Sequence, residues 1–342
     1  MAFEPHPWFI GLEGVEHSAE VARMLAWAAT SGASGIIEPG DLKVRAQTVP
    51  SDSVRIAPGG FVVESKYSGA RQQSYIERAP TETTLEVPAT GSSGGATRYV
   101  VARVTDPDYP GGGTIPAVPN DATYAAPYLV SSLSSTRTEV VLAKIVQPAN
   151  TAAITNTMIT DMRTVANPRR ETVTLGRPSV RADAGPETDL ATREADGGEY
   201  FPGGAGYFNV FKVDVPKWAT QMKIRPEWFS VRYLSGRNVW GTYWMEFGDE
   251  YRNHTWPGSQ QYEFSTQRFQ FDSPGGSTMR TDWSLIDTKT IPAKLRGKTV
   301  DFVFKAALNA GSDLGVSMDI RSGLGCDLTF IQAPASDWEG AS

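Results

Sequence analysis

Residues 42–63 decide the fold class, and they read LKVRAQTVPSDSVRIAPGGFVV. Apolar and polar side chains alternate through Leu42, Val44 and Ala46, and the same alternation returns before the Pro-Gly-Gly turn at 58–60. A period of two is typical of β-strands that bury one face, and Pro and Gly are typical of the turns between them. The stretch therefore predicts short antiparallel strands joined by tight turns.

Further strand-like runs continue this pattern through the first half of the chain. They are QQSYIERA at 72–79, TTLEVPA at 83–89, RYVVARVTD at 98–106 and TEVVLAKIVQPA at 138–149. Clusters of Gly, Pro, Ser or Asp separate most of them, as expected for loops. We expect an N-terminal β-sandwich or barrel-like domain over residues 1–166, ended by Pro168, which breaks a continuing element.

One short helix is predicted in front of these strands. It begins after Ser18, a suitable N-cap, runs to about Thr30, and stops at Gly32. Its apolar stripe consists of Val21, Met24, Leu25 and Ala28. Because an amphipathic helix usually buries its stripe, we expect a packing helix in preference to a helix that docks a partner.

The chain changes character after this first domain. Residues 167–199 hold almost no large apolar side chain, so they are predicted to be a linker or an extended arm that packs on neighbouring copies. Residues 200–342 return to strand-like runs and contain seven of the nine tryptophans. We expect a C-terminal β-sandwich, of the jelly-roll kind, over 200–342.

Composition excludes several classes of function. The formal net charge of −6 argues against nucleic-acid binding driven by counterion release. Cys326 is the single cysteine, so no intrachain disulfide or Cys-rich metal site is expected, and folding in a reducing cytosol is favoured. No basic, apolar leader opens the chain and no run of eighteen apolar residues occurs, so neither a secretory signal nor membrane insertion is expected.

The first half resembles a known family. The runs GDLKVRAQTVPSDSVRIAPGGFVVES, RYVVARVTDPDY and VVLAKIVQPANTAAITNTMITDMR, the last of which ends on Ile159-Thr160-Asp161-Met162-Arg163, are similar to the N-terminal domain of minor tail or baseplate proteins of long-tailed actinobacteriophages. The resemblance covers roughly residues 1–166. No collagen-like stalk or heptad coiled coil is present, which favours a compact baseplate part over a long fibre.

The resemblance implies a virion protein at the tail tip, made in the host cytoplasm. It further implies attachment to other tail or baseplate proteins through the first half, assembly into a homo-oligomer, often a trimer, and a distal domain that meets the host surface. The run TIPAKLRGKTVDFVFKAAL, together with CDLTFIQA, resembles the closing strands of carbohydrate-binding-module jelly rolls. A host-surface glycan is therefore the expected ligand.

Aromatic and polar residues gather in one part of the second half, where they are predicted to bind that ligand. The candidate residues are Trp240, Trp244, Arg252, Asn253, His254 and Trp256. Aromatic rings can stack on the apolar faces of sugars while polar neighbours bind hydroxyl groups. For any single tryptophan, burial in the core is the more common role.

No catalytic residue, metal site or cofactor is predicted. The histidines are scattered without metal-ligand spacing, and GSSGG at 91–95 lacks the strand–turn–helix context of a nucleophile elbow. Two alternatives stay open. One is a glycan-degrading enzyme acting through Glu246, Asp249 or Glu250, which flank the aromatic group. The other is a purely structural baseplate subunit.

Overall fold

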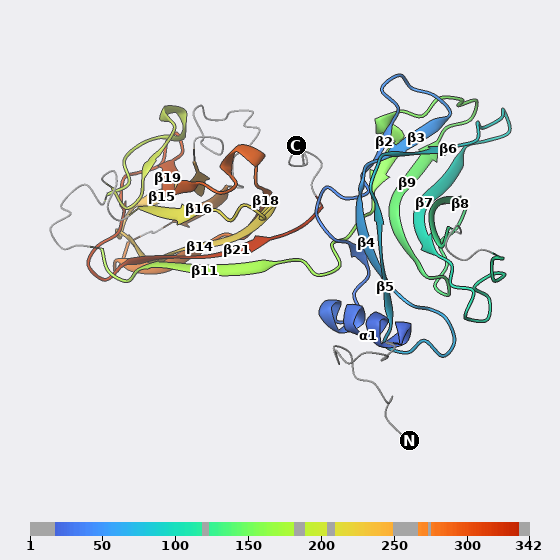
Figure 1. Cartoon of the computed structure of the whole chain (residues 1–342). Helices are drawn as coiled ribbons and strands as arrows, with labels where there is room; N and C mark the ends of the chain where they lie inside the picture. Colours follow the sequence, from blue (N-terminus) through green and yellow to red (C-terminus); the bar gives the residue numbers. More distant parts are fainter. Residues whose placement is uncertain are drawn as a thin grey trace. The chain divides into compact units, whose positions relative to one another are not determined.

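The computed structural model describes residues 18–117, 123–180, 189–203, 209–248, 266–272 and 275–334. These residues form antiparallel β-sheets and one α-helix, α1 (Ala19–Thr30), which confirms the predicted mainly β fold (Figure 1). The chain divides into two compact units, residues 1–168 with 333–342, and residues 169–332. Each unit has its own hydrophobic core.

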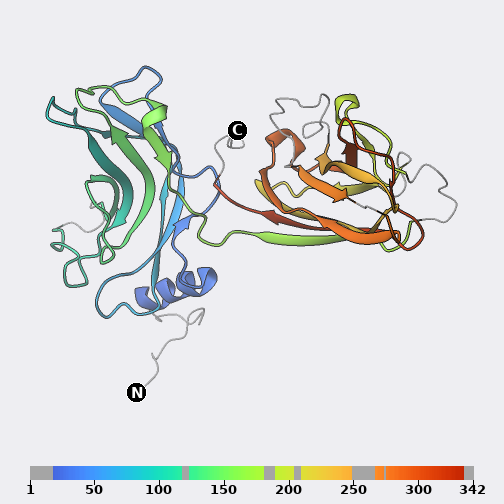
Figure 2. The ribbon, with the colours of Figure 1, turned by 180° about the vertical axis from the view of Figure 1, so that it is seen from behind.

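The first unit is a β-sandwich made of three small sheets, which Figures 1 and 2 show from opposite sides. The first sheet contains β1 (Gly35–Ile36), β4 (Gly59–Glu64) and β5 (Ser74–Ala79), and the second contains β2 (Val44–Ala46), β3 (Ser53–Ile56) and β6 (Thr83–Glu86). The third contains β10 (Ile159–Asp161), β9 (Glu139–Gln147), β7 (Ala96–Val104) and β8 (Ala125–Val130), in that order. A 3-10 turn, η2 (Asn156–Met158), leads into β10.

The period-two pattern of the opening stretch is confirmed in this core. Val44 and Ile56 are paired across β2 and β3 and both are buried, whereas Arg45, which follows Val44 on β2, is exposed. The core is completed by buried residues of β7 and β9, among them Val100 and Leu142. Alternation thus places every second side chain of these strands in one apolar layer.

Asp161 and Arg163 join the end of the first unit to its beginning. The Arg163 guanidinium, which has no exposed surface, donates from Nε and Nη2 to the two carboxylate oxygens of Asp161 at 2.9 and 2.8 Å. Its Nη1 donates to the backbone oxygens of Pro39 and Asp41 at 3.1 and 2.5 Å, and Lys43 Nζ lies 2.6 Å from Asp161 Oδ2. These residues close the unit with a charge-assisted hydrogen-bond network, in which the Arg163 guanidinium is buried and Asp161 is partly exposed.

Stability of the first unit is expected to depend on the charge of Asp161. Burial raises the pKa of this carboxyl, but hydrogen bonds from Arg163 and Lys43 outweigh burial and lower the pKa to about 2, from an ordinary value of 3.8. The folded-state pKa is thus depressed, so the stabilisation is present above the unfolded pKa and is lost as pH falls from 3.8 to about 2. Between pH 3.8 and about 2, the melting temperature of the wild type should fall more steeply with decreasing pH than that of Asp161→Asn. Equal slopes in the two proteins would contradict this prediction.

Helix α1 has the predicted ends but not the predicted orientation. Ser18 caps it, accepting hydrogen bonds from the backbone N–H groups of Glu20 and Val21, and Ser31 ends it in the left-handed conformation. The expectation of a buried apolar stripe is wrong, because no residue of α1 is buried and Met24 and Leu25 are 44% and 47% exposed. The helix packs through its other face, which carries polar anchors.

The second unit is a β-sandwich of two larger sheets. The six-stranded sheet contains β11 (Arg170–Arg177), β21 (Gly323–Ile331), β14 (Gln221–Tyr233) and β17 (Met279–Ser284) in that order, and β18 (Asp287–Thr290) and β20 (Val316–Ser317) also pair with β14. The five-stranded sheet contains β12 (Glu199–Tyr200), β19 (Thr299–Leu308), β15 (Asn238–Phe247) and β16 (Gln267–Asp272), and β13 (Val210–Asp214) also pairs with β19. Two 3-10 turns, η4 (Glu194–Asp196) and η5 (Ala293–Leu295), lie in connecting segments.

Aromatic side chains fill the space between these two sheets. Trp228 of β14 has no exposed surface, and its ring lies 4.9 Å from that of Phe304 and 5.1 Å from that of Tyr243, both on the facing sheet. Its Nε1 donates to the backbone oxygen of Phe201 at 3.1 Å. Trp283 stacks on Tyr243 at 4.8 Å. Several of the tryptophans in this half therefore serve the core, as burial of large rings favours.

The prediction that residues 167–199 form a linker is wrong for the part that the structure describes. β11 pairs with β21 along its whole length, from Arg170 opposite Ile331 to Arg177 opposite Leu324. β11 lies at the edge of the sheet, with one face exposed, so it needs only Val173 and Leu175 as apolar residues. An edge strand with so few apolar side chains has the composition of a linker. Its backbone hydrogen bonds to β21 hold it in the sheet, although it buries little apolar surface.

Candidate functional site

Four of the six predicted ligand-binding residues, Arg252, Asn253, His254 and Trp256, lie outside the described residues. The same holds for Asp249 and Glu250, two of the three carboxylates considered for hydrolysis. Trp240, Trp244 and Glu246 are all described. They lie on β15, on the face of that strand opposite to the core residues Met245 and Phe247.

Trp244 is buried rather than available for stacking. It is 1% exposed, and a side-chain carbon added to Gly198 would lie 2.3 Å from its ring, so the segment before β12 covers it directly. Its Nε1 donates to Glu246 Oε1 at 3.3 Å. The predicted role in sugar stacking therefore does not fit the position of Trp244.

Glu246 is also enclosed. It is 2% exposed, and Lys305 Nζ lies 3.5 Å from its Oε1. Lys305 further donates to the backbone oxygen of Gly197 and lies over the rings of Trp244 and Tyr200. A carboxylate held in this way is part of a buried ion pair, because leaving either charge without its partner would be costly.

Trp240 is the predicted residue that stays partly exposed. Its backbone N–H donates to Ser312 Oγ at 3.0 Å, and its backbone oxygen accepts from the N–H of Asn309 at 3.0 Å. Farther along the same face, Thr242 Oγ1 donates to Glu194 Oε1 at 2.7 Å. The segment around Glu194, which we expected to be a linker, therefore covers the face on which the aromatic site was predicted.

An exposed aromatic ring lies instead on the outer face of the six-stranded sheet. Phe229 of β14 is 40% exposed and points away from its neighbour Trp228, which faces the core. A cavity of about 340 Å³ lies beside it, bounded by residues of β11, β14 and β21. Figure 1 shows these three strands side by side as one layer of the sandwich.

Two paired glycines form the floor of the cavity beside the Phe229 ring. Gly176 of β11 lies opposite Gly325 of β21 in the sheet register. A side-chain carbon added to Gly325 would lie 2.9 Å from the Phe229 ring, whereas one added to Gly176 would meet nothing within 4 Å. The absence of side chains lets the ring lie over one glycine and leaves open space above the other.

Polar and charged groups surround the floor. Asp327 lies opposite both Thr174 and Arg225 in the register, and Thr174 Oγ1 donates to its Oδ1 at 2.8 Å. Glu227 lies opposite Gly325 and forms an ion pair with Arg225 at 3.1 Å. An apolar ring beside carboxylate, guanidinium and hydroxyl groups suits a ligand that has both C–H faces and hydroxyl groups.

The sequence analysis did not predict this site because it placed the ligand where aromatic residues are most frequent, around residues 240–256. The signal was present in the period-two pattern of MKIRPEWFSVRYL, where Trp228 and Phe229 must face opposite sides of one strand. The pattern does not say which side is covered. Gly176 lay in the expected linker, so its pairing with Gly325 could not be anticipated.

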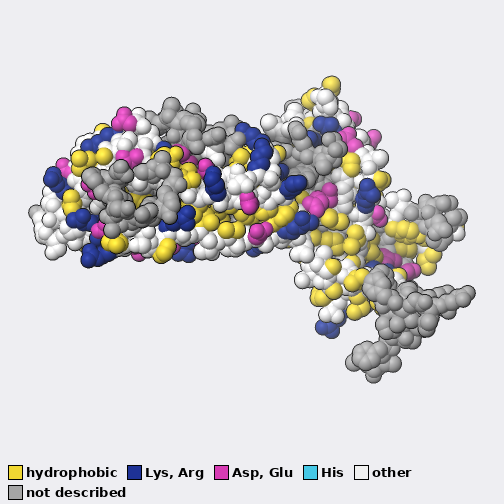
Figure 3. Space-filling view, turned by 60° about the vertical axis from the view of Figure 1, so that its left-hand side comes forward, with side chains coloured by type: hydrophobic (Ala, Val, Ile, Leu, Met, Phe, Trp, Pro, Cys, Tyr) yellow, Lys and Arg dark blue, Asp and Glu magenta, His cyan; other side chains and the backbone are white. Residues whose placement is uncertain are grey.

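Three further features of the described residues concern metal binding, membrane crossing and thiol reactivity. No group of three His, Cys, Asp or Glu side chains there could hold a metal ion, and no helix there is long and apolar enough to cross a bilayer. Burial raises the pKa of the Cys326 thiol to about 12, which keeps it protonated and poorly nucleophilic. On the face seen in Figure 3, basic and acidic side chains are interspersed over both units.

Comparison with known proteins gives no family for this chain. No family model matches it, and no curated protein matches it. Among solved structures, that of the infectious bursal disease virus Gx strain aligns with 14% identity over 90% of this chain and 72% of that chain, at a TM-score of 0.23. The VP2 subviral particle of the same virus aligns with 13% identity over 89% and 68%, at a TM-score of 0.22. Similarity at this level carries no conclusion about function.

Proposed function

We propose that this chain is a phage virion protein of the tail tip or baseplate, in which the first unit attaches to the tail and the second binds a host-surface glycan. The resemblance of residues 1–166 to minor tail proteins supports the attachment role. The observation that carries the binding role is the Phe229 ring above its glycine floor, with Asp327 and Glu227 lining the cavity. Arg225 lies next to both carboxylates, opposite Asp327 in the register and ion-paired with Glu227.

The site has the features that carbohydrate recognition requires. A sugar ring has flat, apolar C–H faces that pack on an aromatic ring, and its hydroxyl groups need hydrogen-bond partners. Gly176 leaves open space beside the ring, and the oxygens of Asp327 and Glu227 can accept hydrogen bonds while Arg225 donates them. Exposed, preformed faces of this kind bind ligands without rearrangement of the core.

Removal of the Phe229 ring is expected to weaken glycan binding at least about fivefold, since truncation of a central anchor commonly costs more than about 1 kcal/mol. The measurement is binding of the full-length chain to a glycan array and to actinobacterial cell-wall fractions. Phe229→Ala is compared with Leu314→Ala, which removes a 55% exposed apolar side chain elsewhere in the unit. Equal binding by the two variants would argue against the site.

A second variant separates loss of the ring from loss of folding. In Gly176→Val the added side chain enters open space above the floor, so the strand should keep its pairing while the site is filled. Binding should fall although the melting temperature is retained. A wild-type chain that binds no envelope fraction would instead favour a purely structural baseplate subunit, and release of reducing ends from a bound polysaccharide would favour an enzyme.

The full-length chain is the right material for this test. A fragment that starts at residue 200 would lack β11 and with it Gly176, Thr174 and one wall of the site. It would also lack the segment before β12 that covers Trp244. Failure of such a fragment to bind would therefore say nothing about the site.

A further inference from the structure

Strand β5 is the last strand of its sheet, and one of its edges is open. In the described part of the chain it pairs with β4 alone. The Ser65 N–H donates to the Gln73 backbone oxygen at 2.9 Å, which sets the ladder so that Tyr75 and Glu77 bond to β4. The N–H and C=O of Ile76 therefore point to the open edge, and its side chain is 59% exposed. Backbone groups displayed in this way are a template for another strand.

Two cavities adjoin this edge on the side of the core. Their volumes are about 410 and 420 Å³, and Glu77, Tyr124 and Ala125 line both. The second cavity is also lined by the core residues Phe61 and Leu142, so it suits an apolar side chain. Because a strand directs every second side chain to one face, residues two positions apart on a strand added to β5 would reach one cavity each.

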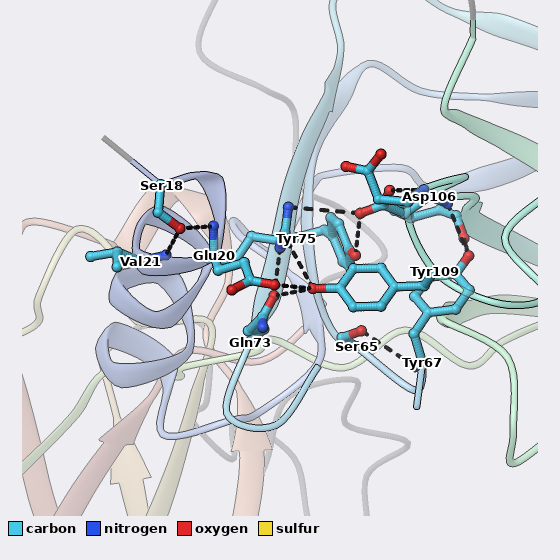
Figure 4. A network of polar contacts seen from close by, with 12 residues as sticks. Ser18, Glu20, Val21, Ser65, Tyr67, Gln73, Tyr75, Asp106 and Tyr109 are labelled. Carbon is cyan, nitrogen blue, oxygen red and sulfur yellow. Dashed lines mark hydrogen bonds and ion pairs between the residues drawn. The ribbon is translucent and has the colours of Figure 1, made fainter. Parts of the chain in front are cut away.

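The wall of the first cavity contains a charge network that is already matched. Arg23 of α1 donates from Nε to Gln73 Oε1 at 2.6 Å and from Nη2 to the Tyr109 hydroxyl at 2.9 Å. Its Nη1 lies 3.7 Å from Asp106 Oδ2, which also accepts a hydrogen bond from the Tyr75 hydroxyl at 2.6 Å. Figure 4 shows Tyr75, Asp106 and Tyr109 gathered in this network. The charge of Arg23 is therefore balanced by that of Asp106.

Two further carboxylates line the first cavity and give it a net negative charge. They belong to Glu77 and Asp108, and neither forms an ion pair with a described residue. Glu77 Oε1 accepts a hydrogen bond from the Arg78 N–H at 2.7 Å, which holds this carboxylate beside the open edge. Apolar groups form other parts of the wall, among them Pro116 and the 68% exposed Ile115. A lysine or arginine side chain suits this cavity, because its stem is apolar and its end is cationic.

We propose that the open edge of β5 accepts an extended segment of a partner protein, in which a basic residue and an apolar residue stand two positions apart. The segment pairs with the backbone of Ile76, its basic side chain enters the first cavity, and its apolar side chain enters the second. In strand addition, main-chain hydrogen bonds give affinity and cavities for alternate side chains give specificity. This contact would serve the attachment role proposed for the first unit, on which it rests.

Short peptides added to the full-length chain test this contact by fluorescence anisotropy. The probes are two labelled peptides in which threonines flank Lys-Val-Leu or Leu-Val-Lys, so that both strand directions are covered, and at least one should bind. Replacing its lysine by norleucine should weaken binding about fivefold, as loss of a partly exposed ion pair allows. N-methylation of its valine should weaken binding about tenfold by removing a backbone donor. A wild type that binds neither peptide, or that binds the altered forms equally well, would overturn the proposal.

Ile76→Pro tests the same edge from the side of the protein. The Ile76 N–H takes no part in the ladder to β4, so proline removes the donor to the added strand without removing a bond of the sheet. Peptide binding should fall about tenfold, whereas Ile76→Thr, which keeps the N–H, should bind like the wild type. Glu77→Gln keeps an acceptor for the Arg78 N–H and should reduce the preference for lysine over norleucine. Equal binding by Ile76→Pro and the wild type would contradict strand addition.

Phage tails assembled without this chain separate the contact from the attachment role. Tails that bind the wild type and Ile76→Pro alike would leave the attachment role in place and overturn the edge of β5 as its site. A wild type that binds the lysine peptide but no tail would contradict the attachment role and support β5 as a strand acceptor. Tails that bind the wild type and not Ile76→Pro would support both.

Discussion

Arg163→Met is expected to lower the free energy of unfolding of the first unit by about 3–5 kcal/mol, because the enclosed guanidinium makes four hydrogen bonds and each buried acceptor left without its donor costs about 1–3 kcal/mol. The substitution removes the two hydrogen bonds that the guanidinium donates to Asp161, which keeps the one from Lys43. It also leaves the backbone oxygens of Pro39 and Asp41 without their buried donor. Met has a similar length and no charge, so the loss reports on the hydrogen bonds more than on volume.

Calorimetry of the full-length chain measures this effect, because two units with separate cores should unfold in two transitions. The transition of the first unit should move to lower temperature, and that of the second should stay. Arg71→Met, at an exposed position of the same unit, is the control and should move neither. A loss below about 1 kcal/mol in Arg163→Met would mean that the network contributes little net stability.

Trp228→Ala should destabilise the second unit by a comparable amount, about 3–5 kcal/mol, through the cavity left by a fully buried ring. The ring contacts Phe304 and Tyr243 of the facing sheet, and its N–H satisfies the Phe201 backbone oxygen. Denaturant unfolding monitored by near-ultraviolet circular dichroism follows this core. Phe229→Ala removes the next aromatic ring along the strand, which lies on the opposite, exposed face. It should lower the free energy of unfolding much less than Trp228→Ala does. Similar losses in the two variants would contradict the assignment of these faces.

The fold class could be predicted because alternation is a local property. The alternation around Val44 and around Ile56 shows in the sequence which side of each strand is apolar. Both residues lie on the same buried side of the sheet in the structure. Helix α1 shows where this reasoning stops. Its stripe and its ends were read correctly, but which face is covered depends on Gln73, Tyr109 and Glu64, which are distant in sequence.

The burial of Trp244, one of the predicted ligand-binding residues, could not be anticipated for the same reason. From residue 241 to residue 247 both faces of β15 are buried, because residues around Glu194 and Gly198 cover the side that carries Trp244. Their sequence has few apolar residues since they cover the sheet through hydrogen bonds. Pairing of β11 with β21, more than 140 residues apart, is equally invisible in composition, although it creates the glycine floor. Long-range pairing of polar segments leaves almost no local signal.

The chain enters and leaves the second unit in a way that would allow this unit to be exchanged for another domain. The chain enters on β11 and leaves on β21, and the N–H of Gln332 donates to the backbone oxygen of Arg169 at 3.0 Å where the two strands meet. Both junctions therefore lie at one point, so residues 169–332 can be exchanged as a cassette for another domain whose ends lie together. Recombination at these two junctions would give the first unit a new second domain without changing its own strand order.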